Sequence, residues 1–200
     1  MTKSAAIVGG GVIGGGWAAR FLLNGWNVRV YDPDPEAERK IGEVLANARR
    51  SLPGLSEVAL PAEGALVFCT DLAEAVRDAD WIQESVPERL DVKHATLSAI
   101  QSACAPGAVI GSSTSGFKPS QLQEGSPAPG QIMVCHPFNP VYLLPLVEVV
   151  TTAQNGSAHV ELAKRILTEK HDDLERLAQG LLEYETLTGD EITKVIAEIG

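Results

Sequence analysis

One histidine and one glutamate have the residue types and the spacing that acid–base chemistry requires. His136 follows the apolar segment 131–135, and Glu148 lies within the apolar run 146–150. We expect a carboxylate flanked by valines to be partly buried, and a buried carboxylate needs a partner that offsets its desolvation. The 11 residues between the two are enough for the chain to fold back and bring the side chains together. Such a pair is a base able to take an alcohol proton near neutral pH, although a single histidine at a strand end is more often structural.

Hydroxyl side chains gather after a second apolar segment, residues 109–111. At the carboxyl end of a parallel strand, hydroxyls lie where open α/β sheets bind ligands. Alternatively, they cap a helix that begins near residues 118–122. Both interpretations can hold for different members of the group. The four residues are Ser112, Ser113, Thr114 and Ser115.

The glycine-rich stretch near the amino terminus predicts an anion site. Residues 5–8 form a short apolar run typical of a buried parallel strand, and three glycines follow at G-x-G-x-x-G spacing. In this motif the first glycine permits a tight turn, the second lets the backbone approach a pyrophosphate, and the third lets the helix pack closely on the strand. The N–H groups at the start of the helix attract the anion. The residues that we place around it are Gly9, Gly11, Val12, Ile13 and Gly14.

An acidic residue after the next strand selects the kind of dinucleotide. Residues 28–31 form a second apolar run that ends in Asp32, 18 residues after Gly14. A carboxylate at this position accepts hydrogen bonds from the adenosine ribose and repels a 2′-phosphate, so the predicted cofactor is NAD rather than NADP. The alternative, a merely flexible glycine-rich loop, explains neither the second strand nor its acidic end.

The elements that must position these residues alternate between strand and helix. This alternation predicts an α/β fold with a doubly wound, Rossmann-like, mostly parallel sheet. Helices are expected at 12–23, at 36–51 with Pro53 and Gly54 closing it, at 72–76 and at 91–103. Further strands are expected at 65–69, 81–86, 109–111, 131–135 and 146–150.

Composition bounds the remaining possibilities. With 200 residues, of which 44% are hydrophobic and 21% charged, the chain can bury one sizeable core and add a small second unit. The net charge of −10 argues against nucleic acid or an anionic membrane surface as a partner. No run approaches 18 apolar residues and no secretory signal pattern is present, so we expect a cytoplasmic protein. Cys69, Cys104 and Cys135 are widely spaced, which favours reduced thiols over disulfides or metal ligands.

Five ordered motifs together carry a family resemblance. Residues 1 to about 155 resemble the nucleotide-binding domain of the 3-hydroxyacyl-CoA dehydrogenase family. The resemblance implies NAD-dependent oxidation of the 3-hydroxyl of a small 3-hydroxy acid. A 3-hydroxyacyl-CoA substrate is the weaker alternative, because Arg49 and Arg50 are followed at once by Pro53 and Gly54, which leaves little of a basic helix for the 3′-phosphate. The motifs occupy residues 9–20, 31–34, 84–89, 112–119 and 136–148.

The resemblance also implies roles for individual residues. Ser115 would hydrogen-bond the 3-hydroxyl or keto oxygen of the substrate, and His136 would be the general acid and base. Glu148 would orient His136 and stabilise its protonated form. The spacings of 21 and 12 residues between these three match the family pattern. Glu84 and Lys93 lie in segments that line the cofactor cleft in such enzymes.

The last part of the chain departs from the family pattern. Family members continue into an all-helical domain that supplies a dimer interface and an asparagine in a Gly-Phe-x-x-Asn-Arg-like segment, whereas residues 156–200 read as a different helical tail. The tail from about residue 158 resembles the C-terminal helices of membrane-bound AAA+ zinc metalloproteases, without the H-E-x-x-H of protease chemistry. We expect helices at about 157–183 and from about 190. Complete family members are usually homodimers. Without the helical domain a dimer is doubtful, and the second functional hypothesis is an NAD-binding module with little or no turnover.

Overall fold

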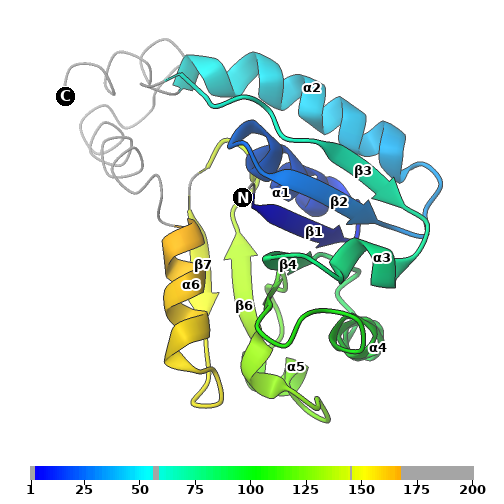
Figure 1. The fold of residues 1–200 in the computed structure, drawn as a ribbon, viewed down its shortest axis with the longest axis vertical. Helices are drawn as coiled ribbons and strands as arrows, with labels where there is room; N and C mark the ends of the chain where they lie inside the picture. Colours follow the sequence, from blue (N-terminus) through cyan, green and yellow to red (C-terminus); the bar gives the residue numbers. More distant parts are fainter. Residues whose placement is uncertain (1–2, 56–58, 145, 168–200) are drawn as a thin grey trace.

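The computed structural model describes residues 3–55, 59–144 and 146–167, which form one sheet with helices on both faces (Figure 1). The strand order is β3-β2-β1-β4-β5-β6-β7, and neighbouring strands are parallel except for β7, which is antiparallel to β6. The predicted doubly wound α/β fold is therefore confirmed. The strands are β1 (Ser4–Val8), β2 (Asn27–Tyr31), β3 (Leu66–Cys69), β4 (Trp81–Glu84), β5 (Val109–Ser112), β6 (Ile132–Pro137) and β7 (Val147–Val150).

The helices form two layers because alternate residues of each strand point to opposite faces of the sheet. Ala5 and Ile7 of β1 belong to a core that includes residues of α1, α2 and α6, whereas Ala6 and Val8 belong to a second core with residues of α3, α4 and α5. The helices are α1 (Val12–Leu23), α2 (Ala37–Leu55), α3 (Leu72–Val76), α4 (Leu90–Gln101), α5 (Pro119–Leu122) and α6 (Ser157–Leu167), and a short 3₁₀ helix spans Pro129–Gln131.

The order in which successive strands are added to the sheet reverses between β1 and β4. From β1 it runs outward through β2 to β3, then crosses back to β4 on the other side of β1 and continues outward through β5 and β6. The carboxyl ends of β1 and β4 therefore flank the point where the strand order reverses, and open α/β sheets bind ligands at this point.

Four predicted element ends differ from the structure by two residues or more, among them that of the helix predicted at 91–103, which ends at Gln101. The helix predicted to close before Pro53 continues through it to Leu55, because a proline in the last turn removes only one hydrogen bond of the helix. The strand predicted at 81–86 ends at Glu84, and the strand predicted at 131–135 continues to Pro137 through its pairing with β7.

The last described helix carries only part of the predicted tail. α6 ends the described chain at Leu167, so the remainder of the helix predicted at 157–183 and the helix predicted from 190 lie outside the described residues. Ala163 is completely buried against the first core. In the part of the chain that the structure describes, every helix is too short or too polar to span a bilayer.

Candidate active site

The turn after β1 takes a conformation that only glycine adopts readily. Gly9 has φ +101°, and its N–H donates to the carbonyl of Tyr31 on the neighbouring strand at 3.0 Å. A Cβ on Gly9 would lie 2.6 Å from the carbonyl group of Ser85, which is too close for any side chain. The first glycine therefore fixes how β1, β2 and the segment after β4 meet.

The other two glycines of the motif have different surroundings. A Cβ on Gly14 would lie 1.8 Å from the carbonyl oxygen of Gly9 and 3.2 Å from the Ile7 side chain, so the start of α1 packs directly on the turn and on β1. Gly11 precedes the first residue of α1, and a Cβ there would meet no atom within 4 Å. Open space beside Gly11 is what a pyrophosphate approaching the helix start requires. Val12 is exposed and Ile13 is half-buried against the first core.

A cavity of about 770 Å³ adjoins the glycine turn where the strand order reverses. Asp32 lies in its lining. Its carboxylate accepts hydrogen bonds from the backbone N–H of Gly10 and, at 2.7 Å, of Asp34, which fixes the carboxylate on the rim of the cavity. A carboxylate has more acceptor sites than these two bonds use, so it can still accept from ribose hydroxyls. The lining also includes Gly9, Gly10, Gly11, Ser85, Val86 and Pro87.

Glu84 and Lys93, predicted near the cofactor, lie beneath the cavity and are absent from its lining. Both side chains are buried, and Lys93 Nζ lies 2.8 Å from Glu84 Oε1. Glu84 also accepts hydrogen bonds from the hydroxyl of Ser112 and, at 2.8 Å, from the N–H of Val86. Because Val86 does line the cavity, this buried ion pair supports the segment that forms part of its wall, and a contact of Glu84 or Lys93 with a cofactor stays a prediction.

A second carboxylate, Glu88, holds the loop after β5 and was not among the predicted residues. Its Oε1 accepts hydrogen bonds from the hydroxyl of Thr114 and from the N–H groups of Ser115 at 3.2 Å and Gly116 at 2.8 Å, while Oε2 lies 3.3 Å from Lys93 Nζ. Burial raises the pKa of the Glu88 carboxyl, but the bonds from Thr114 and Gly116 and the charge of Lys93 outweigh it and lower the pKa below the ordinary value. One sequence signal could have indicated Glu88: it is an acid that follows Pro87, directly after a strand.

Of the four clustered hydroxyls, only Ser115 is exposed. The Ser112 hydroxyl donates a hydrogen bond to Glu84. The Ser113 hydroxyl accepts one from the side-chain amide of Gln83, at 2.9 Å between Oγ and Nε2. Thr114 bonds Glu88 and also accepts from the N–H of Phe117 at 3.2 Å, one residue before the N-cap of α5. The capping alternative is therefore wrong, since none of these bonds reaches a residue of α5 itself. Three of the hydroxyls hydrogen-bond other groups of the protein, and Ser115 is the exposed member of the group.

His136 and Glu148 are brought together by the antiparallel pairing of β6 and β7, in which they are direct partners. Nδ1 of the imidazole lies 3.6 Å from Oε2 of the carboxylate, beyond a normal hydrogen bond, and the Nδ1 atom is buried with no hydrogen-bond partner among the described residues. The ring of Phe138 stands edge-on to the imidazole with centroids 5.5 Å apart. The pairing predicted from the sequence is thus present in the structure.

The predicted burial of Glu148 is wrong, since its side chain is 63% exposed. β7 is an edge strand, and its residues alternate between the two faces. Val147 and Val149 pack against the first core, so Glu148 points the other way, toward His136 and solvent. The neighbouring valines indicated burial only for their own face of the strand.

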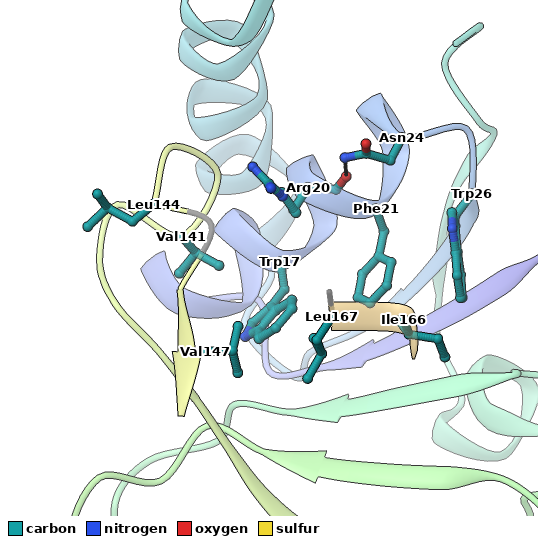
Figure 2. A pocket seen from close by; sticks show the side chains of 10 residues that line it. All are labelled: Trp17, Arg20, Phe21, Asn24, Trp26, Val141, Leu144, Val147, Ile166 and Leu167. Carbon is teal, nitrogen blue, oxygen red and sulfur yellow. Dashed lines mark hydrogen bonds between the residues drawn. The ribbon is translucent and has the colours of Figure 1, made fainter. Parts of the chain in front are cut away.

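The loop between the two residues is held by α1. Arg20 donates to the carbonyl of Tyr142 at 3.2 Å, and a Cβ on Gly16 would lie 2.7 Å from Cβ of Val141. A small cavity of about 60 Å³ adjoins this contact. Figure 2 shows its lining, in which Val147 of β7 lies beside Trp17 of α1. This packing fixes the apolar face of β7 and, through it, the place of Glu148.

Ser115 and His136 emerge at the same edge of the sheet. β5 and β6 are parallel neighbours in which Ser112 is paired with Val134, so the residues that follow each strand lie at the same carboxyl edge. Among the described contacts, no hydrogen bond links Ser115 to His136 or Glu148. The arrangement provides an exposed hydroxyl, an imidazole and its carboxylate at the edge that also holds the cavity beside the glycine turn.

Comparison with known proteins gives a family match along most of the chain. Residues 4–173 match the family described as 3-hydroxyacyl-CoA dehydrogenase, NAD binding domain. The L-carnitine dehydrogenase/betainyl-CoA thioesterase of Ruegeria pomeroyi is 73% identical over 164 residues, which are 82% of this chain and 34% of that protein. The L-carnitine dehydrogenase of Mesorhizobium japonicum is 54% identical over 167 residues, 83% of this chain and 46% of that protein. The chain thus spans about a third to a half of the length of these relatives.

Solved structures of related enzymes share the fold. A 5-formyl-3-hydroxy-2-methylpyridine 4-carboxylic acid 5-dehydrogenase, described as an NAD⁺-dependent dismutase, superimposes with a TM-score of 0.77 at 25% identity, over 98% of this chain and 70% of that one. The 3-hydroxybutyryl-CoA dehydrogenase of Escherichia coli K12 gives a TM-score of 0.73 at 25% identity, over 84% of this chain and 36% of that one.

The comparisons do not support the predicted resemblance of the tail to AAA+ metalloproteases. The dehydrogenase match reaches residue 173, well past the residue near 158 where that resemblance was expected to begin. The described start of the tail is amphipathic, and its apolar residues Leu162 and Ile166 pack against the first core. A separate unit at 156–200 remains a prediction.

Proposed function

Because this chain belongs to the 3-hydroxyacyl-CoA dehydrogenase family, we propose that it oxidises the 3-hydroxyl of L-carnitine to the ketone of 3-dehydrocarnitine, with NAD⁺ as the oxidant. The observation that carries the reaction type is the pair of His136 and Glu148 at the sheet edge that also bears the dinucleotide cavity. The substrate rests on the names of the relatives at 73% and 54% identity. The five sequence motifs likewise resemble those of L-carnitine dehydrogenases most.

The cavity fits the cofactor on three counts. Gly11 leaves open space at the start of α1, Gly9 forms the tight turn, and Asp32 presents a carboxylate on the rim. The pyrophosphate would lie against the N–H groups of Gly11, Val12 and Ile13, and the adenosine ribose against Asp32. Bound NAD⁺ supplies the acceptor for the hydride that leaves C3 of the substrate.

The residues of the chain handle the proton and the substrate oxygen. His136 takes the proton of the 3-hydroxyl through Nε2, because Nδ1 faces Glu148. The carboxylate of Glu148 stabilises the imidazolium that forms and holds the ring in orientation. Ser115 hydrogen-bonds the same oxygen and fixes its position as the hydroxyl becomes a ketone.

Two alternative functions are tested in the same experiment. A 3-hydroxyacyl-CoA substrate is favoured by the family description and by the similar fold of the Escherichia coli enzyme. An NAD-binding module with little or no turnover is the second, because the chain spans only part of its relatives' length.

The experiment combines NADH titration with a turnover assay. The purified chain is titrated with NADH by fluorescence, and NADH formation is then followed with NAD⁺ and L-carnitine, D-carnitine or 3-hydroxybutyryl-CoA. NADH formation with L-carnitine above the other two substrates, and its loss in His136→Ala, would support the proposal. Preference for the acyl-CoA, or NADH binding without turnover on any of the three, would overturn it in favour of the corresponding alternative. We also propose a cytoplasmic location. Complete members of the family are usually homodimers, but for this chain we expect no stable dimer, and light scattering of the same sample measures its mass.

A further inference from the structure

A lysine lies on the rim of the dinucleotide cavity beside two carboxylates. Lys40, Asp32 and Asp34 all belong to the lining. Lys40 Nζ lies 2.5 Å from Oδ2 of Asp34, in an ion pair in which both side chains remain partly exposed. Asp32 accounts for the ribose in the proposed function, but that function assigns nothing to Asp34 or Lys40.

Asp34 is held firmly in the position that engages the lysine. Its Oδ1 accepts from the N–H of Glu36 at 2.9 Å, and its own N–H donates to Oδ1 of Asp32 at 2.7 Å. These two bonds fix the side chain and the backbone at the start of α2, so that the remaining carboxylate oxygen points to Lys40. The hydrogen bond from Lys40 lowers the pKa of Asp34 and raises that of the lysine, so both groups stay charged at neutral pH.

The neighbouring cation of α2 is also engaged by carboxylates. Arg39 donates to Glu36 at 2.8 Å and to Glu43 at 2.6 Å. Arg39 and Lys40 are the two basic residues of the described first turn and a half of α2. Each therefore has an acidic partner, and of the two cations only Lys40 lines the cavity.

A lysine near the 2′ position of the adenosine ribose would ordinarily favour NADP, because an ammonium group binds phosphate strongly. We propose that Asp34 is a specificity-determining residue that holds Lys40 in an ion pair and so prevents this lysine from binding the 2′-phosphate of NADP. Asp32 repels the phosphate directly, and Asp34 removes the cation that would attract it. This inference rests on the proposed NAD site.

The substitution Asp34→Asn isolates the ion pair. The amide oxygen of asparagine can still accept from Glu36, so the turn before α2 keeps its shape, but the neutral side chain no longer holds the ammonium group. Lys40 is then free to reach a 2′-phosphate. One charge-assisted hydrogen bond gained by NADPH corresponds to roughly a tenfold change in affinity.

The readout is the ratio of the Kd for NADPH to the Kd for NADH, measured by fluorescence titration. We expect the ratio to fall about tenfold in Asp34→Asn, and we expect the fall to disappear in the double variant Asp34→Asn/Lys40→Met, because the gain depends on the lysine. Glu43→Gln is the matched control. It also removes one carboxylate from this part of the protein, but that carboxylate pairs with Arg39 rather than with Lys40.

The outcomes separate this inference from the proposed function. Failure of the wild-type chain to bind NADH would overturn the NAD site itself. NADH binding by the wild type with an unchanged ratio in Asp34→Asn would overturn only the role of Asp34. An equal fall of the ratio in Glu43→Gln or in the double variant would also overturn it, because general charge reduction would then explain the effect.

Discussion

Glu148 lies directly opposite His136 across β6 and β7, with its Oε2 3.6 Å from Nδ1 of the imidazole. The histidine side chain is 26% exposed and the glutamate 63% exposed, so the carboxylate covers the Nδ1 side of the ring from the solvent face of the edge strand. Because Glu148 covers Nδ1, Nε2 is the ring nitrogen that we expect to face the substrate.

Replacing Glu148 by glutamine should lower kcat by at least about tenfold, because the neutral amide neither stabilises the imidazolium nor fixes the ring as a carboxylate does. The pairing of β6 with β7 is made by backbone atoms, so the fold should persist. Steady-state kinetics with L-carnitine and NAD⁺ measure the change. A Glu148→Gln variant with the wild-type kcat would show that the pair has no role in the reaction.

Replacing His136 by alanine should reduce turnover by about 10²–10⁴-fold, the usual contribution of a general base. NADH affinity should change little, because the glycine turn that receives the pyrophosphate lies at the end of β1, three strands away from β6 in the sheet. Turnover and NADH titration on one preparation test both parts. Loss of NADH binding in His136→Ala would mean that the histidine supports the cofactor instead.

The parts of the fold that the sequence predicted well have local signals. The glycine spacing, the short apolar strands and the turn after β2 each follow from residues within a few positions of one another, and all three lie where they were expected. The pairing of His136 with Glu148 was predictable because the 11 residues between them are enough for the chain to fold back, although the burial expected for Glu148 was wrong.

The sequence is a poorer guide where the surroundings of a side chain depend on which face of a strand it occupies, or on which distant loop it contacts. Glu84 ends a strand that is buried on both faces, so its side chain meets Lys93 inside the protein, while neighbours of both residues line the cavity. The role of Glu84 and Lys93 toward the cofactor stays a prediction. Glu88, four residues later, reaches the Ser115 loop through a contact between segments 26 to 28 residues apart. Its place after Pro87 could mark it as a candidate, but not which loop it contacts. Glu148 is exposed because only the alternate residues of an edge strand face the core.

Replacing Glu88 by glutamine should destabilise the protein at neutral pH, by no more than about 1 kcal/mol because the side chain is 43% exposed. The pKa of Glu88 is lowered in the folded protein, so its stabilisation is fully present above the ordinary carboxyl pKa. It is lost as the pH falls below that value and through the lowered pKa of the folded state. The free energy of unfolding of wild type and Glu88→Gln should therefore differ at pH about 7 and converge below pH about 4. Urea unfolding at several pH values measures this difference, and a gap that widens in acid would contradict the assignment.

The glycine turn allows folding and cofactor binding to be tested separately. Gly14→Ala should lower the free energy of unfolding by about 1–3 kcal/mol or more, because the new Cβ would meet the backbone oxygen of Gly9 at 1.8 Å and the turn would have to move. Gly11→Ala should leave stability within about 0.5 kcal/mol of the wild type, since no atom lies within 4 Å of the added methyl group.

Gly11→Ala should bind NADH more weakly than the wild type, although its stability should be unchanged. The methyl group of Gly11→Ala occupies the open space through which a pyrophosphate reaches the start of α1, so the Kd for NADH should rise by at least about tenfold while the protein remains as stable as the wild type. Urea unfolding and NADH titration on both variants give the comparison, and each variant serves as the control for the other. If Gly11→Ala bound NADH with the wild-type affinity, the pyrophosphate could not lie against this turn, because a ligand in contact with that backbone cannot share the space with a methyl group.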